Sequence, residues 1–359
     1  MHVIKPLLAL SHNLVFIFIG ILGIGFIIGF HELGHFLFGK LFQIKTPSFS
    51  IGFGPKIYKK KIGDTNFSIG AIPLGGYVES DAKSFESKPY YQKMIVLGGG
   101  IAFNLLFAHI VFCALFSLGL PNTRYIYPIN TVPIIKSVDK SDEVQQLGLN
   151  PGDQILAIES QKIKKETTPL FFKLRELSEK TKKKVDLQIK RGEKIQNVTI
   201  DTEKLKNALA QMKITFIFSD KKGTGIIDSI TKGIKLTNAH IMATLALFKN
   251  MAIKRDTSAV GGPILIISET VKGAGQGLKT FLLLLAIISV SLAILNLIPL
   301  PILDGGQALL YTIEALIRTK LSDKTKEAIF IASWILMLFL FVLISARDIW
   351  RIVLSFIKK

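Results

Sequence analysis

The chain has 359 residues, of which 49% are hydrophobic, and a formal net charge of +19. Its mean hydropathy of +0.43 is too high for an ordinary soluble protein of this length, so we expect a membrane protein. The lysines are spread over loops without an aromatic-interleaved basic helix, so no nucleic-acid partner is predicted and anionic membrane lipids are favoured. A single cysteine, Cys113, excludes an intramolecular disulfide.

Four charge-free apolar runs predict about four transmembrane helices. A helix needs roughly 20 residues to cross a hydrocarbon core of about 30 Å. The runs cover residues 14–30, 94–120, 281–303 and 328–346. The first run lacks a strongly basic start and a following signal-peptidase site, so we expect it to be retained as a span.

The charge of the loops predicts the orientation. Residues 40–93, between the first two runs, hold nine lysines against four acidic residues, whereas only Lys5 precedes the first run. The positive-inside rule therefore places this loop in the cytoplasm and the long connection after the second run outside. The basic residues at the C-terminus lie outside in this arrangement, against the same rule, because four spans that begin outside also end outside.

His31, Glu32 and His35 form an H-E-x-x-H pattern at the end of the first apolar run. On a helix, residues i and i+4 share a face, so both imidazoles can reach one zinc ion while the intervening glutamate serves as the base. Two histidines and a carboxylate beside a lipid-spanning run are costly unless they face an interior and act there. The pattern therefore predicts a catalytic metal site.

The cytoplasmic loop carries a hairpin pattern. Residues 49–54 and 67–72 alternate apolar with small or polar side chains around a basic turn at residues 59–64, which predicts two paired strands. The hairpin either re-enters the membrane or lies solvated at the interface. Apolar arms with a basic turn held at the headgroups favour re-entry.

The connection between the second and third runs contains a small domain. Strand-like pieces at residues 134–135, 155–158, 185–189 and 198–200 surround one helix-like stretch at residues 168–177, which predicts an α+β arrangement. The turn formed by Gly148, Leu149, Gly152 and Asp153 resembles the G-L-x-x-G-D turn of bacterial PDZ domains. That resemblance implies binding of an extended peptide at a sheet edge, at or near these four residues. A plain small barrel with a Gly-Asp turn is the alternative.

After this domain the pattern becomes helical and amphipathic, which predicts helices lying along the membrane surface. Glycines divide this stretch into separate pieces. The expected organisation is a first membrane half, a PDZ-like domain, surface helices and a second membrane half, at residues 1–120, 121–222, 223–277 and 278–359.

A catalytic zinc ion needs a third protein ligand and an open coordination position. Asp304 is the only other acidic residue attached to a charge-free run in a comparable setting. Pro299 and Pro301 remove backbone donors and break the helix just before it, so that the carboxylate can turn inward beside a cavity. Asp304 is therefore the predicted third ligand of one Zn2+ ion.

Together, H-E-x-x-H on the first span and N-x-x-P-x-x-x-L-D-G on the third resemble the site-2 protease family of intramembrane zinc metalloproteases. The single PDZ-like domain makes the chain similar to the bacterial RseP type, although relatives of this type often have two. The resemblance implies a polytopic α-helical membrane protein with a re-entrant β-hairpin and an inserted PDZ-like domain.

Carried over by position, the resemblance implies that His31, His35 and Asp304 hold zinc and that Glu32 is the catalytic base. It assigns substrate handling to residues on the third span and at the end of the hairpin, namely Asn296, Pro299, Gly75, Gly76 and Tyr77. It also matches Gly98, Gly99, Gly100 and Asn104 to the G-x-x-x-N element of the second span, for which helix packing is an equal explanation.

The implied function is cleavage of transmembrane segments of single-span proteins, such as an anti-sigma factor or remnant signal peptides, in regulated intramembrane proteolysis. The implied location is the inner membrane, with the active site toward the cytoplasm and the PDZ-like domain in the periplasm. The alternative is a non-proteolytic, zinc-binding membrane scaffold that acts through its PDZ-like domain. Glu32 argues against a scaffold, because a structural zinc site needs no base.

Overall fold

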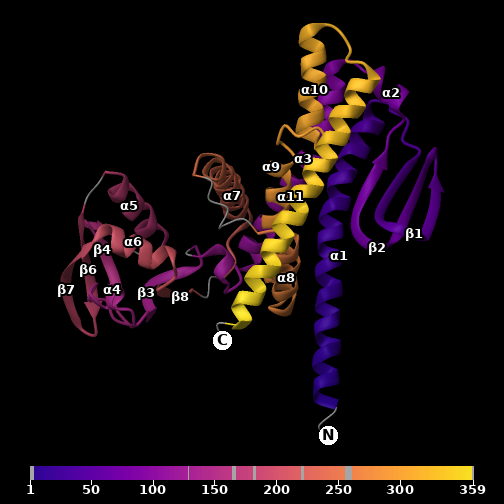
Figure 1. Ribbon diagram of the computed structural model, residues 1–359. Coiled ribbons are helices and arrows are strands. Elements are labelled where there is room, and N and C mark those ends of the chain that lie inside the picture. Colours follow the sequence, from indigo (N-terminus) through magenta and orange to yellow (C-terminus); the bar gives the residue numbers. More distant parts are fainter. Residues whose placement is uncertain are drawn as a thin grey trace. The chain divides into compact units, whose positions relative to one another are not determined.

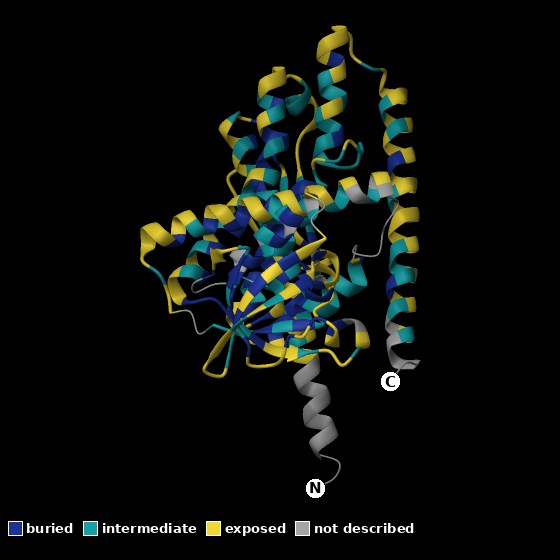
Figure 2. Cartoon of the chain, turned by 90° about the vertical axis from the view of Figure 1, so that its left-hand side faces the viewer, coloured by how far each residue is buried: buried dark blue, intermediate teal, exposed yellow. Residues whose placement is uncertain are grey.

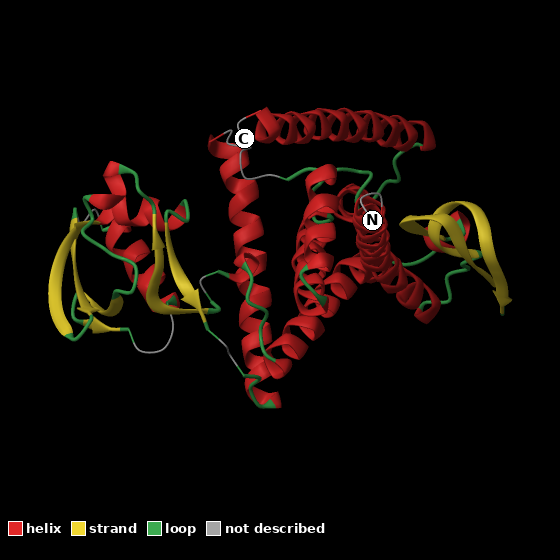
Figure 3. Ribbon diagram, turned by 90° about the horizontal axis from the view of Figure 1, so that it is seen from below, coloured by secondary structure: helices red, strands yellow, loops and turns green. Residues whose placement is uncertain are grey.

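The computed structural model describes residues 4–127, 129–163, 167–180, 183–219, 222–254 and 261–357. The chain divides into two compact units, one formed by Met1–Ser117 with Gly225–Lys359 and the other by Leu118–Thr224. Both units combine helices with strands (Figure 3). The first unit contains the predicted metal ligands.

Within the described ranges, four helices are long and apolar enough to cross a membrane, which matches the predicted number. They are α1 (Ile4–Leu41), α3 (Tyr90–Leu118), α9 (Leu278–Leu295) and α11 (Asp323–Ile357) (Figure 1). Where α1 crosses α3, a Cβ built on Gly99 would lie 2.8 Å from Gly34 O, and one on Gly34 would collide with Gly99 O. Side chains at these two positions would therefore force the helices apart.

The third predicted run is not helical throughout. Helix α9 ends at Leu295, eight residues before the end of the apolar run, and α10 (Asp304–Ile317) begins with Asp304 itself. Pro299 and Pro301 lie in the non-helical segment between them, since proline cannot donate to a helical hydrogen bond. The break turns Asp304 toward α1.

The predicted hairpin consists of β1 (Ser48–Ile62) and β2 (Thr65–Glu79). Both strands double back, so that the start of β1, Ser48 to Ile51, pairs with residues 66–69 on one side and with residues 76–79 on the other. Strand β1 continues through Ile62, so the predicted turn at residues 59–64 is mostly strand and the chain turns only at residues 63 and 64. Strand β2 packs against α1.

The short helix α2 (Ala82–Glu86) joins the hairpin to α3. Beyond the second unit, α7 (Ile226–Lys254) packs against α9, and α8 (Pro263–Gly275) packs against α1, α9 and α11. The fully buried carboxylate of Asp348 on α11 accepts hydrogen bonds from Gly262 N (3.2 Å) and Leu265 N (3.1 Å) at the start of α8. Away from this contact, α11 is largely exposed (Figure 2).

The second unit is a mixed α+β domain around one apolar core. Its strands follow the order β7-β6-β4-β3-β8, with β5 paired to β4. The strands are β3 (Thr131–Val138), β4 (Gln154–Ile158), β5 (Gln161–Lys162), β6 (Lys184–Arg191), β7 (Lys194–Asp201) and β8 (Ile214–Phe218). The helices are α4 (Asp142–Gln145), α5 (Thr168–Glu179) and α6 (Thr202–Ala210). Alternating burial along β6, with Val185, Leu187 and Ile189 inside, is the period-2 signature of a half-buried strand.

Candidate metal centre

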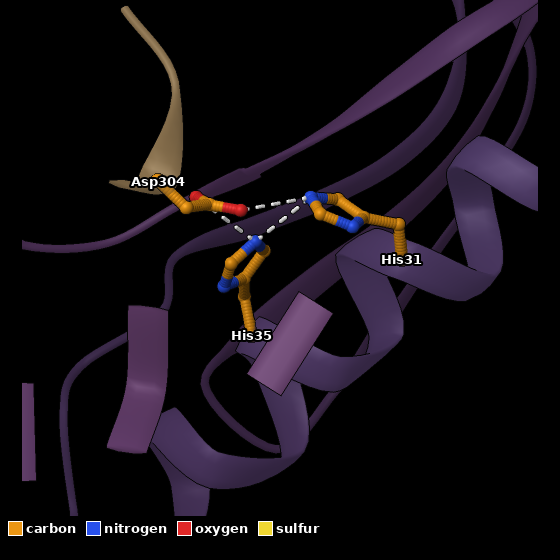
Figure 4. Close-up of side chains that lie close together, drawn as sticks. All are labelled: His31, His35 and Asp304. Atoms are coloured by element: carbon orange, nitrogen blue, oxygen red, sulfur yellow. Dashed lines mark hydrogen bonds and ion pairs between the residues drawn. The ribbon is translucent and has the colours of Figure 1, made fainter. Parts of the chain in front are cut away.

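Helices α1 and α10 bring the three predicted metal ligands together. His31 and His35 lie one turn apart on the same face of α1, and Asp304 meets them from the first position of α10 (Figure 4). The Nε2 atoms of the two imidazoles are 3.1 Å apart, and the Asp304 carboxylate oxygens lie 3.2 Å from His31 Nε2 and 3.4 Å from His35 Nε2.

These separations fit a zinc ion. Tetrahedral ligands at about 2.0–2.1 Å from zinc lie about 3.3 Å from one another, which matches all three separations in the centre. Asp304 Oδ2 is buried and, among the described residues, has no hydrogen-bond partner of acceptable geometry, although His31 Nε2 is near. Three lone-pair donors thus converge on one point, and a cation would satisfy them together.

The centre opens into a pocket of about 470 Å³. Of the predicted catalytic, metal-binding and substrate-binding residues, it is lined by His31, Glu32, His35, Asp304 and Asn296. Pro299 is exposed in the helix break, outside the pocket wall, while Asn296 O accepts a hydrogen bond of 2.7 Å from the backbone N of the residue after Asp304. Asn296 therefore both faces the pocket and fixes the start of α10.

The end of β2 borders Glu32. A Cβ built on Gly76 would lie 3.5 Å from Glu32 Cγ, and Val78, two residues further along the strand, lines the pocket. Tyr77 stacks on Phe53 at 6.5 Å between ring centroids, and Gly75 packs against the same ring. Of the hairpin residues predicted to bind substrate, Gly76 is thus beside the predicted base.

Several pocket residues were not predicted from the sequence. Glu86 of α2 and Tyr311 of α10 line the pocket, and so does Gln307, which lies between Asp304 and Tyr311 along α10. The spacing of Asp304, Gln307 and Tyr311, at i, i+3 and i+7, places them on one face of α10. That spacing is the one signal in the sequence that could have revealed two of these residues.

The four predicted PDZ-like residues lie in one turn of the second unit. Leu149 and Asp153 are 3% and 1% exposed, so they pack inside the unit, whereas Gly148 and Gly152 are exposed. The Asp153 carboxylate accepts two hydrogen bonds from Arg191, at 2.8 and 2.7 Å. These contacts give Asp153 a structural role, and peptide binding by this turn stays a prediction.

A two-histidine, one-carboxylate centre with a glutamate beside it, in a unit with four apolar spans, defines the class of membrane metallohydrolases. The profile of peptidase family M50 matches residues 19–340. The chain is 30% identical to a protein of Clostridium perfringens named as a zinc metalloprotease, over 93% of this chain and 98% of that protein. It is 27% identical to a chloroplastic membrane metalloprotease of Arabidopsis thaliana, over 93% of this chain and 78% of the relative.

The chain therefore belongs to peptidase family M50, the site-2 protease family. It is a zinc metalloprotease with several membrane spans. This confirms the predicted family, the predicted enzyme class and the predicted zinc cofactor, for which His31, His35 and Asp304 form a potential binding site.

Proposed function

We propose that the protein cleaves transmembrane segments of single-span membrane proteins, with zinc held by His31, His35 and Asp304 and with Glu32 as general base. The convergence of the three ligand atoms within 4.8 Å of one another is the observation that carries the proposal. The pocket adds support, because Glu32 lines it beside the ligands. A scissile bond that enters through this pocket would therefore reach the predicted base and the predicted metal ligands together.

Zinc, when bound, polarises the scissile carbonyl and makes hydroxide available near neutral pH. Glu32 takes a proton from the attacking water on its carboxylate and delivers it to the nitrogen of the leaving amine. Asn296 lines the pocket, which supports a role in hydrogen-bonding the substrate backbone. Other residues of the pocket wall, such as Val78 and Gln307, would then hold the extended segment and limit the entry of bulk water.

A transmembrane substrate must unwind before attack, and its freed backbone groups need new partners. Residues 76–79 pair on one side with the start of β1, and this supports pairing of the unwound segment on their other side. Glu32 and the pocket adjoin these residues. The hairpin would then act as a membrane re-entrant loop, with its basic turn at lipid headgroups.

The chain is proposed to be of the RseP type, located in the inner membrane with its metal centre toward the cytoplasm. The α+β architecture of the second unit and its Gly-Asp turn, in which Leu149 and Asp153 are buried, support a PDZ-like domain. The lysine-rich hairpin supports the orientation. Proposed substrates are single-span regulators such as an anti-sigma factor, or remnant signal peptides. This would make the enzyme part of regulated intramembrane proteolysis.

The test distinguishes the role of Glu32 as base from the roles of the three residues proposed to bind zinc. Glu32→Gln should abolish cleavage of a single-span reporter while zinc content stays at one ion per chain, whereas His31→Ala, His35→Ala and Asp304→Ala should each lose both. Zinc is measured on the purified full chain by elemental analysis, and cleavage by the fragments released. Near wild-type cleavage by Glu32→Gln would overturn the mechanism. Stoichiometric zinc with no cleavage by the wild-type chain of any single-span reporter would favour the non-proteolytic scaffold.

A further inference from the structure

Three positions on one face of α3 meet the two histidines of the metal centre. Val96, Gly100 and Asn104 are spaced at i, i+4 and i+8, so they form a single line along the helix. We propose that this line orients the ligands: the Val96 carbonyl and the Asn104 amide each hold the Nδ1 atom of one imidazole, and Gly100 leaves the space that both rings occupy. The inference rests on the proposed zinc site and adds three positioning residues to it.

The Val96 carbonyl holds His35. His35 Nδ1 lies 2.8 Å from Val96 O, a carbonyl that can only accept. The proton of a neutral His35 is therefore on Nδ1, and Nε2 keeps its lone pair toward Asp304 and His31. An acceptor behind a ligating imidazole fixes both the tautomer and the angle of the ring.

Asn104 holds His31 in the same way. Asn104 is 1% exposed, and its amide lies 3.2 Å from His31 Nδ1. Asn104 Oδ1 is buried without a hydrogen-bond partner among the described residues, so the amide can turn about its last bond without losing another hydrogen bond. Turned in this way, Oδ1 accepts the Nδ1 proton that His31 carries when its Nε2 faces a metal.

The backbone of Asn104 is itself fixed by a third span. Ser289 of α9, which is fully buried, donates a hydrogen bond of 2.9 Å from Oγ to Asn104 O. Asn104 therefore joins α1 through its side chain and α9 through its carbonyl. A polar side chain buried between spans is costly unless it is paired, and the contact with His31 is the one that pairs the Asn104 amide.

Gly100 provides the space for both rings. A Cβ at this position would lie 2.5 Å from His31 Cε1 and 2.7 Å from His31 Nδ1, and it would collide with His35 Nε2. Gly98, two residues earlier on α3, offers a matched comparison, because a Cβ there meets nothing within 4 Å. Alanine at position 100 must therefore displace the imidazoles, whereas alanine at position 98 leaves them in place.

The experiment measures zinc affinity of the purified full chain by competition with a chelator, together with the melting temperature of the metal-free chain. Asn104→Leu removes the acceptor at similar volume and should weaken zinc binding about 10–100-fold. Asn104→Asp restores an acceptor and should bind zinc within about threefold of the wild type. Gly100→Ala should weaken binding at least as much as Asn104→Leu, and Gly98→Ala should not change it.

Rescue by the Asn104→Asp variant distinguishes orientation from packing, because a purely structural role would make Asn104→Leu and Asn104→Asp differ in melting temperature and not in affinity. Equal zinc affinity of Asn104→Leu and wild type would overturn the assignment of Asn104. Equal affinity of Gly100→Ala and Gly98→Ala would overturn that of Gly100. If the wild-type chain bound no zinc at all, the proposed function and this inference would both be wrong.

Discussion

Tyr311 Oη donates a hydrogen bond of 2.9 Å to Glu86 Oε1 across 225 residues of sequence. This bond ties α10, which begins with Asp304, to the short helix α2. Glu86 also pairs with Lys93 at 3.0 Å and with Lys326 at 3.4 Å, so that one carboxylate joins α2, α3, α10 and α11. The position of the predicted third ligand thus depends on the contacts of Glu86, which lines the same pocket.

Glu86→Gln should lower the stability of the protein at neutral pH, by about 1–3 kcal/mol, because the buried Lys93 loses its counter-ion. Burial alone would raise the pKa of Glu86. Its hydrogen bonds to Lys93 and Tyr311 lower the pKa by more than burial raises it, so the net shift is downward from 4.5. A lowered carboxyl pKa stabilises the fold above its unfolded value and loses this effect as the pH falls through the folded value.

The wild-type melting temperature should therefore fall below about pH 4.5 more steeply than that of Glu86→Gln. Melting curves of the full chain in detergent across pH 3–7 measure this difference. Glu193→Gln is the matched control, since that carboxylate is 96% exposed and pairs with Lys190 at 3.6 Å. Parallel pH curves for the wild type and Glu86→Gln would contradict this role of Glu86.

In the second unit, Arg191→Met should destabilise the turn that contains Gly148 and Asp153. Arg191 holds Asp153 with two hydrogen bonds and donates a third, of 2.7 Å, to Gly148 O. Among the described residues, its loss leaves the buried carboxylate with only the hydrogen bond from Asn150 N, which costs on the order of 1–3 kcal/mol because Arg191 itself is 38% exposed. Limited proteolysis of the full chain should cut this unit faster, while zinc content stays unchanged. Lys190→Met is the control, because Lys190 precedes Arg191 in β6 but, within the described part of the chain, pairs only with the exposed Glu193, at 3.6 Å. Equal proteolysis of the two variants would refute the role assigned to Arg191.

The proposed orientation predicts opposite labelling of two exposed lysine positions. Lys61 lies in the hairpin and Lys184 at the start of β6. In a Cys113→Ala background, cysteine at position 184 should react with a membrane-impermeant thiol reagent in cells whose inner membrane is intact, and cysteine at position 61 should react only after lysis. The reverse pattern would invert the topology.

Deletion of residues 131–218 should leave cleavage of a minimal single-span peptide intact. Thr131 pairs with Phe218, and Ser219 N donates a 2.8 Å hydrogen bond to Asn130 O, so a short flexible bridge can join the cut ends. If the second unit filters substrates, the deleted enzyme should also cut reporters with large external domains that the intact enzyme rejects.

A recruiting role for this unit predicts a different result. Cleavage of pre-trimmed substrates would then fall after the deletion, because the unit would no longer bind their newly exposed ends. Steady-state cleavage of one transmembrane segment, carrying either a long or a trimmed external part, separates the two roles. Loss of all cleavage with zinc and folding retained would exclude both.

The sequence predicted the parts of the site that follow from local spacing. His31 and His35 share a face of α1 because they are four residues apart, and Asp304 turns inward because prolines end the preceding helix. The environment of Lys93, in contrast, was not predicted from local spacing. It counts as a loop charge in the sequence, yet it is 6% exposed and paired with Glu86. Its burial depends on helices that are distant in sequence.

For the fold, as for the site, some elements were predicted from the sequence and others were missed. The alternating hairpin and the strands at residues 134–135, 155–158, 185–189 and 198–200 all occur. Helix α6 and strand β8 were not predicted, although the side chain of Asp201 caps α6 by accepting a hydrogen bond of 2.9 Å from Lys204 N. The doubling back of β1 on β2 was also missed, because alternation fixes which side chains share a face and leaves the pairing register open.

The size of the pocket has a consequence for the supply of reactant. Each peptide bond hydrolysed consumes one water molecule, and spans α1, α3 and α9 are surrounded by hydrocarbon in a membrane. A molecule of liquid water takes about 30 Å³, so a cavity of about 470 Å³ has room for several at once. The pocket therefore has room beside Glu32 for the water that hydrolysis consumes, so this water does not have to cross the lipid around the spans.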